Sequence, residues 1–154
     1  MITAPNMTQI PATPSLLGTW QLVSFEARDS KGQLHYPLGE RVSGLLVYDA
    51  GGNMAAHVMK NSRTLFAAND PDCGTDAEVR AAFESYASYF GTYTVDPARQ
   101  TVTHHVRGAW YPNCIGSDQL RHFKFKGSRL VLSTSALTSS GESLEYILTW
   151  ERIL

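Results

Sequence analysis

The stretch from Thr101 to Phe123 holds most of the residues that could carry chemistry. It contains three of the chain's five histidines, a Trp-Tyr-Pro-Asn loop, and an arginine, Arg121, within a predicted strand. Histidine suits proton transfer and ligand binding because its ordinary pKa is near 6.5. Arginine presents a planar fork of donors to a carboxylate, enolate or phenolate. The stretch therefore predicts a site that handles protons or an anionic or carbonyl-bearing ligand.

Strand alternation assigns the two adjacent histidines to opposite faces. Val102, His104 and Val106 share one face of the predicted strand, and His105 lies on the other. We expect His104 to point inward and His105 to point to solvent. Two interpretations of His104 stay open: a core histidine hydrogen-bonded to a neighbouring tyrosine or carbonyl, or a group that transfers protons or binds a ligand.

Arg121 is the residue whose position most needs an explanation. It shares a strand face with Gln119 and Phe123, whereas lysines that must reach water lie on the other face. An inward arginine is costly unless it is paired or hydrogen-bonded. The sequence offers two partners, an internal salt bridge to Glu26, which alternation also turns inward, or the anionic group of a ligand.

A catalytic hypothesis and a binding hypothesis draw on overlapping residues. Tyr93 and Tyr146 fall on the predicted inner face, where a phenol hydroxyl could orient a carbonyl or relay a proton. The candidate catalytic residues are His104, Arg121, Glu26 and Tyr93. The candidate ligand-binding residues are Ser24, Trp110, Gln119, Phe123, Tyr146 and Leu148.

Composition excludes several classes of function. The net charge is -1 and no run of Lys or Arg forms a basic stripe, so nucleic acid is not an expected partner. Cys73 and Cys114 form no C-x-x-C pair, and the histidines lack the i, i+4 helical spacing of a zinc site. No P-loop, G-x-G-x-x-G or G-x-S-x-G motif is present. We therefore expect no metal and no cofactor.

The chain of 154 residues is predicted to form one domain, residues 15–154, after a flexible tail at residues 1–14. The tail is rich in Thr and Pro and lacks the basic and apolar regions of a signal peptide. No stretch is apolar enough for a membrane span. A cytoplasmic protein without a membrane partner is the expectation, and the oligomeric state is left open.

Eight main strands and one helix are expected from the pattern of apolar residues. Thr75 and Glu78 match a capping box, and apolar residues at helical spacing follow as far as Tyr86 and Phe90, which predicts a helix of about four turns. The predicted strands cover residues 19–27, 42–49, 53–59, 91–95, 101–108, 119–126, 129–135 and 143–153.

If the strands form an up-and-down barrel, the lengths of the connections predict that its two ends differ. Short turns follow the second, fourth and sixth strands, and long connections follow the first, third, fifth and seventh. In an up-and-down antiparallel barrel, all short turns then lie at one end, and the helix and long loops surround a mouth at the other. The same order places Trp20 beside Arg152 at the tight end, where the arginine is expected to stack on the indole.

An ordered set of motifs resembles a known family. The segments are LLGTWQLVSFE, P-x-G, GLLVYDAGGNM, SYFGTYTVD, VTHHV, a Pro-Asn loop, Q-x-R-x-F and L-x-W-x-R. Across residues 16–154 this order resembles the bacterial and fungal lipocalin-like domain family, and Gly18-Thr19-Trp20 resembles the G-x-W that opens lipocalins. The resemblance implies an all-β, eight-stranded antiparallel up-and-down barrel with one α-helix near the mouth.

The resemblance implies a ligand cavity and leaves three functions open. The first is binding of a small, largely apolar organic molecule with a polar or anionic group. The second is a cofactor-independent isomerase or cyclase of secondary metabolism that uses acid–base chemistry and oxyanion stabilisation in the same cavity. The third is a structural or interaction domain with a filled barrel.

Overall fold

The computed structural model describes residues 15–153, so the predicted tail at residues 1–14 lies outside the described residues. The described chain contains ten strands, one α-helix and two short 3₁₀ helices. In chain order the elements are β1 (Gly18–Asp29), β2 (Leu34–His35), β3 (Val42–Tyr48), β4 (Asn53–Lys60), η1 (Pro71–Cys73), α1 (Asp76–Glu84), β5 (Tyr86–Asp96), β6 (Thr101–Ala109), η2 (Pro112–Cys114), β7 (Asp118–Lys126), β8 (Arg129–Ser133), β9 (Leu137–Ser139) and β10 (Glu142–Arg152).

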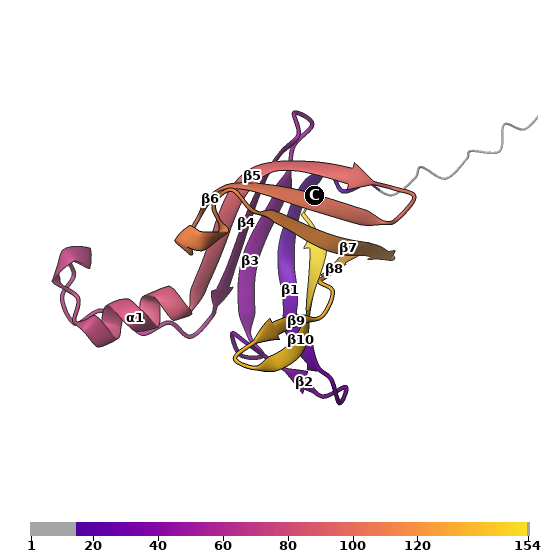
Figure 1. Cartoon of the computed structure of the whole chain (residues 1–154). Helices are drawn as coiled ribbons and strands as arrows, with labels where there is room; N and C mark the ends of the chain where they lie inside the picture. The colour runs from indigo at the N-terminus through magenta and orange to yellow at the C-terminus, as the bar shows by residue number, and fades with distance from the viewer. Residues whose placement is uncertain (1–14, 154) are drawn as a thin grey trace, which may run out of the picture.

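Eight of the strands close into an antiparallel barrel (Figure 1). Neighbouring strands follow the order β1-β3-β4-β5-β6-β7-β8-β10, and β10 pairs back with β1. The short strands β2 and β9 extend the sheet beside β1 and β10. Closure leaves none of these eight strands as a sheet edge. The predicted eight-stranded antiparallel barrel is confirmed, and β9 is an addition that the sequence pattern does not predict.

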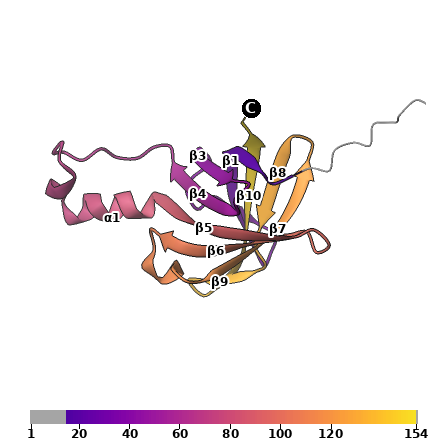
Figure 2. The same cartoon turned by 90° about the horizontal axis from the view of Figure 1, so that it is seen from above.

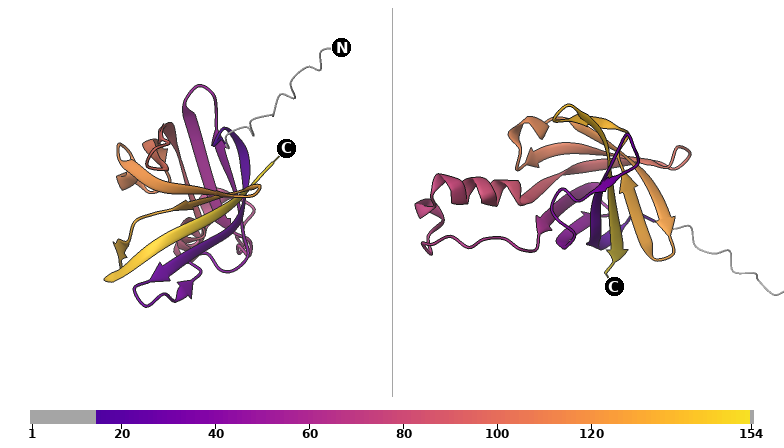
Figure 3. Two further views of the ribbon diagram at one scale, coloured as in Figure 1. Left: turned by 90° about the vertical axis from the view of Figure 1, so that its right-hand side faces the viewer. Right: turned by 90° about the horizontal axis from the view of Figure 1, so that it is seen from below.

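The two ends of the barrel differ as the connection lengths predict. Short turns join β3 to β4, β5 to β6 and β7 to β8, whereas long connections leave β1, β4, β6 and β8. The views in Figure 3 show the short hairpin turns and the longer connections at different ends of the strands. The end with the short turns is called the tight end below, and the other end is called the mouth.

Trp20 and Arg152 close the tight end. The Arg152 guanidinium carbon lies 4.0 Å from the centre of the Trp20 ring, which confirms the predicted stacking. Arg152 also donates to the backbone oxygens of Leu17 and Ser15, and the Trp20 indole N–H donates to the oxygen of Leu16. These contacts hold the segment before β1 against the end of β10.

Large apolar side chains fill the barrel between the tight end and the middle. Trp20, Trp150, Leu46, Leu130 and Val102 are each at most 1% exposed. Their burial supplies the hydrophobic stabilisation of the barrel, at roughly 25 cal/mol for each Å² of apolar surface removed from water. The packed half therefore supports the mouth half, where space remains.

The helix α1 is shorter than predicted and extends away from the barrel (Figures 1 and 2). The capping box at Thr75 and Glu78 is confirmed, but the helix ends at Glu84. Tyr86 and Phe90 lie on β5 because residues 86–92 pair with β4. None of the helix residues is buried, and no helix among the described residues has the length and apolar character needed to cross a membrane.

A β-bulge interrupts the alternation of β1. Leu22 pairs with Trp150, but Ser24 pairs with Thr149, so Val23 is an extra residue. One extra residue moves every following side chain to the opposite face. Phe25 therefore faces the interior in place of Ser24.

A second bulge lies between β5 and β6. Phe90 pairs with Gly108, but Gly91 pairs with Val106, which leaves Arg107 as the extra residue. The strands approach closely here, since a Cβ at Gly91 would collide with the backbone oxygen of His105. The extra residue belongs to β6, so it changes the faces of Gly108 and Ala109, whereas Tyr89, Gly91 and Tyr93 keep the alternation of β5.

Candidate functional site

A cavity of about 490 Å³ occupies the mouth half of the barrel. Residues of the β1–β3, β4–β5 and β6–β7 connections contribute to its wall, which places it beside the mouth. Most of the wall is apolar, and it includes Phe25, Leu38, Leu46, Ala56, Val58, Leu132, Leu148 and Trp150. The polar and charged side chains on the wall are Glu84, Tyr86, Tyr89, His104, Arg121, Thr134 and Tyr146.

His104 lies between two tyrosine hydroxyls on the wall of this cavity. Its Nε2 is 2.6 Å from the Tyr48 hydroxyl, and its Nδ1 is 2.6 Å from the Tyr89 hydroxyl. Tyr48 comes from β3, Tyr89 from β5 and His104 from β6. His104 is 1% exposed, so the inward direction predicted from alternation is confirmed. The neighbouring tyrosines satisfy both ring nitrogens.

Burial and a nearby cation keep His104 neutral. Burial lowers its pKa from 6.5 to about 3, and the nearby Arg121 and His105 side chains act in the same direction. Burial also raises the pKa of the Tyr48 and Tyr89 hydroxyls, although Arg121 opposes part of the effect on both. All three side chains are therefore uncharged near neutral pH.

Arg121 faces the cavity and has no carboxylate partner among residues 15–153. Its Nη1 donates to the Leu120 oxygen at 3.0 Å, and its Nη2 lies 3.4 Å from Gln119 Oε1. Glu84 is the carboxylate on the cavity wall, and it forms a 2.9 Å ion pair with Arg80 instead. The positive charge of Arg121 is thus available to the cavity.

Five of the residues predicted for the site line this cavity. His104 and Arg121 from the catalytic set are joined there by Trp110, Tyr146 and Leu148 from the ligand-binding set. Trp110 is at the mouth, and its backbone N–H donates to the Ser88 oxygen. The structure brings these five together, and their roles stay predictions.

Ser24 and Glu26 do not line the cavity, and the expected inward direction of Glu26 is wrong. The bulge at Val23 places Phe25 on the cavity wall and turns both neighbours to the outer face. The predicted salt bridge from Arg121 to Glu26 is likewise not found among the described ion pairs. An anionic ligand remains as the other partner that the sequence offered for Arg121.

Tyr93 and Phe123 lie nearer the tight end than the cavity. Both line a separate surface depression next to Ser15, and the Tyr93 hydroxyl donates to the Asp49 oxygen at 2.9 Å. Gln119 does not line the cavity either, but it contacts Arg121 and donates to Ser117 Oγ at 2.9 Å. Gln119 is therefore placed to orient the guanidinium.

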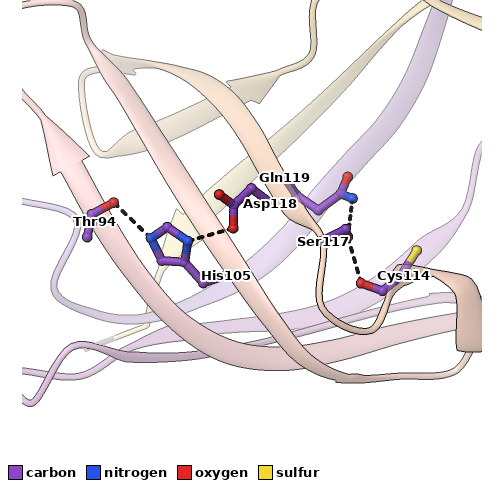
Figure 4. A network of polar contacts seen from close by, with 6 residues as sticks. All are labelled: Thr94, His105, Cys114, Ser117, Asp118 and Gln119. Atoms are coloured by element: carbon purple, nitrogen blue, oxygen red, sulfur yellow. Dashed lines mark hydrogen bonds and ion pairs between the residues drawn. The ribbon is translucent and has the colours of Figure 1, made fainter.

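His105 has a different environment on the outer face of the barrel (Figure 4). Its Nε2 is 3.0 Å from Thr94 Oγ1 and its Nδ1 is 2.7 Å from Asp118 Oδ1. The three residues come from neighbouring strands and none lines the cavity. Figure 4 also shows the chain of contacts from Gln119 through Ser117 to the Cys114 oxygen. Alternation thus separates the adjacent histidines as expected.

Tyr48 and Tyr89 belong to the site but were not among the predicted residues. Tyr48 lies on a strand with apolar residues on both faces, so alternation gives it no direction. Tyr89 falls where helical spacing seemed to continue beyond Glu84. A signal for Tyr89 did exist, because three tyrosines and one phenylalanine within residues 86–93 favour a strand over a helix.

The described residues contain no group of three or more His, Cys, Asp or Glu side chains arranged to hold a metal ion. The side chains of the site themselves offer an apolar wall, a buried chain of hydrogen bonds through His104, and the charge of Arg121.

Comparison with known proteins agrees with this architecture. The family model described as "Lipocalin-like domain" matches residues 17–153. Comparison with curated proteins and with solved structures gives no match. The match covers nearly the whole barrel, from the segment before Trp20 to the residue after Arg152. The chain therefore belongs to the lipocalin-like domain family.

Proposed function

We propose that the protein binds a small, largely apolar organic molecule inside the barrel and that a polar or anionic group of this molecule contacts Arg121. The observation that carries the proposal is the cavity of about 490 Å³, which has a mainly apolar wall and one arginine without a carboxylate partner among the described residues. Ligand pockets in proteins combine an apolar wall with a few placed polar groups in this way.

The cavity argues against a filled barrel. A structural domain would be expected to occupy its interior with side chains, since protein interiors are close-packed. Here the packed region lies toward the tight end and open volume remains beside the mouth. Arg121 also supports a ligand site. A half-buried arginine without an ion pair lowers stability, and it is retained more readily where it has a ligand.

Two measurements test binding. Native mass spectrometry of the purified protein is expected to detect a co-purifying small molecule. Titration with 1-anilinonaphthalene-8-sulfonate, an apolar probe with one anionic group, is expected to give saturable fluorescence. Arg121→Met should weaken its binding about tenfold, as expected for the loss of one charge-assisted hydrogen bond.

A variant that fills the cavity separates binding in the barrel from binding on the surface. Ala56 lines the cavity, so Ala56→Phe is expected to abolish probe binding while far-ultraviolet circular dichroism stays that of a barrel. Leu65→Phe is the matched control because Leu65 is 88% exposed. Equal binding by wild type, Ala56→Phe and Leu65→Phe would contradict a ligand site in the barrel.

A cofactor-independent isomerase or cyclase is a second candidate, favoured by the position of Arg121, which could stabilise an enolate oxygen. Such an enzyme also needs a base. His104 has both ring nitrogens engaged, and the Glu84 carboxylate is paired with Arg80. Glu26, the other base considered, does not line the cavity. Binding is therefore the better supported function.

Exchange of carbon-bound hydrogen distinguishes the two candidates. In D₂O, 2-tetralone exchanges the hydrogens beside its carbonyl through an enolate, and NMR follows the rate. A binding protein is expected to leave this rate at the buffer value. Acceleration by the wild type that disappears in Arg121→Met would instead make the isomerase the better conclusion.

A further inference from the structure

The Tyr48 hydroxyl has a single hydrogen-bond partner among the described residues. That partner is His104 Nε2, and Tyr48 is itself 1% exposed. If His104 Nε2 carried the ring proton, it would donate to Tyr48, and the buried Tyr48 O–H would have no acceptor. An unsatisfied buried donor costs roughly 1–3 kcal/mol. Tyr48 therefore donates to His104 Nε2.

This direction fixes the tautomer of His104. A neutral imidazole carries one proton, so when Nε2 accepts, Nδ1 must hold the N–H. The Nδ1–H then donates to the Tyr89 hydroxyl oxygen at 2.6 Å. Hydrogen bonds thus run in one direction, from Tyr48 through His104 to Tyr89.

The last donor of this chain faces the cavity. The Tyr89 oxygen accepts from His104, so its own proton is free for another acceptor. Tyr89 and Arg121 both line the cavity, and Arg121 is close enough to the Tyr89 hydroxyl to affect its pKa. Tyr89 and Arg121 therefore offer two donors on the wall of the same cavity.

Trp150 is a further residue of the cavity wall whose hydrogen-bond donor, the buried Nε1, lacks a partner among the described residues. Buried indole N–H groups usually have an acceptor. Like Tyr89 and Arg121, Trp150 offers a donor and needs an oxygen that accepts.

We propose that the cavity recognises its ligand through an oxygen without a hydrogen, as in a carbonyl, enolate, phenolate or carboxylate, held by Tyr89 and Arg121, and that it prefers the anionic form of an acidic ligand. The proposal rests on the proposed binding function and deepens it. The chain from Tyr48 strengthens the Tyr89 donor, since hydrogen bonds in series polarise one another. The same donors disfavour an ammonium group at this position, because it has no acceptor and carries the same charge as Arg121.

A nitronaphthol tests this preference directly. It is an apolar bicyclic phenol whose anion absorbs at a longer wavelength than the neutral form. The expected result is that the pKa of the bound probe is about one to two units lower than in water, as charge-assisted hydrogen bonds to the phenolate predict. Tyr89→Phe and Arg121→Met should each remove most of this shift.

Tyr48→Phe and Tyr93→Phe provide the matched comparison. Tyr48 is not on the cavity wall, so only a directed chain through His104 explains a partial loss of the probe's shift in Tyr48→Phe. Tyr93→Phe removes a hydroxyl that bonds to Asp49 and should keep the full shift. If the bound probe keeps its solution pKa, or if the wild type and all variants shift this pKa equally, this inference is wrong. The proposed binding function would still stand. Failure of both probes, the nitronaphthol and the sulfonate, to bind would overturn both proposals.

NMR of the unaltered protein tests the tautomer without a ligand or a variant. Two-bond ¹H–¹⁵N spectra are expected to show His104 with a protonated Nδ1 and an unprotonated Nε2 that accepts a hydrogen bond. A protonated Nε2 would reverse the direction of the chain and refute the proposal, whatever the result with the nitronaphthol.

Discussion

The pKa of His104 differs between the folded and the unfolded protein. Its two nitrogens are hydrogen-bonded inside the barrel, and burial together with the charge of Arg121 lowers its pKa to about 3. In the unfolded chain the same ring has an ordinary pKa near 6.5. The unfolded state therefore binds a proton between these two values and the folded state does not.

The consequence is a pH dependence of stability. As pH falls from 6.5 toward 3, protonation of His104 in the unfolded chain lowers the free energy of unfolding by up to about 1.4 kcal/mol per pH unit. The stabilising contribution of neutral His104 is fully present only above pH 6.5. Urea denaturation of wild type and His104→Gln from pH 7 to pH 4 measures this. The difference between the two free energies of unfolding should shrink as pH falls. Parallel curves would show that His104 titrates alike in both states.

Alternation predicts the direction of single residues but not their partners. It places His104 and Arg121 inward and His105 outward from the sequence alone. It gives no partner for His104, because Tyr48 is distant in sequence and lies on a strand with two apolar faces. The hydrogen-bond chain is thus a product of barrel closure.

At the scale of elements, a bulge decides which side chains of β1 reach the cavity. The bulge at Val23 exchanges Ser24 for Phe25 on the wall, whereas Tyr89 follows the unbroken alternation of β5 through Gly91 and Tyr93. A bulge depends on pairing with a neighbouring strand, so the local sequence of one strand does not reveal it. This is why the alternation of β1 fails beyond Leu22.

Deletion of Val23 tests the role of the first bulge. Without the extra residue, regular alternation from Leu22 still turns Phe25 toward the interior and Glu26 toward solvent, so the free energy of unfolding should fall by only about 1 kcal/mol. Phe25→Glu, which places an unpaired carboxylate on the cavity wall, should lower it by at least about 3 kcal/mol. Similar denaturation midpoints for both variants would contradict this account.

The sequence pattern predicts where α1 begins but not where it ends. The capping box marks its start in the sequence, but apolar spacing continues through Tyr86 into a strand. Hydrogen bonds from β5 to β4 override the helical pattern after Glu84. Because α1 has no buried residue, it contributes to the mouth, where Phe83 lines the cavity, more than to the core.

At the scale of the whole molecule, connection length is the most informative property of the sequence. Within the barrel that the family resemblance implies, it predicts two different ends and the meeting of Trp20 with Arg152, which the structure confirms. The volume inside the barrel depends on packing among all eight strands, so it has no local signal in the sequence.

Arg152 is expected to stabilise the barrel without affecting the cavity. Arg152→Met removes two hydrogen bonds to backbone oxygens and the contact with Trp20, and should lower the free energy of unfolding by about 2 kcal/mol. Urea denaturation measures the loss. Affinity for 1-anilinonaphthalene-8-sulfonate should stay within twofold of the wild type, since Arg152 does not line the cavity. A tenfold weaker affinity would show that the two ends are coupled.

The separation of the tight end from the mouth also has an evolutionary consequence. The contact of Trp20 with Arg152 lies at one end, and the long connections at the other end include residues of the cavity wall such as Leu38 and Trp110. Sequence changes in these connections can alter ligand choice while strand register is maintained elsewhere. The same division makes the molecule a scaffold for engineering, in which the loops can be randomised as a library while the eight strands remain fixed.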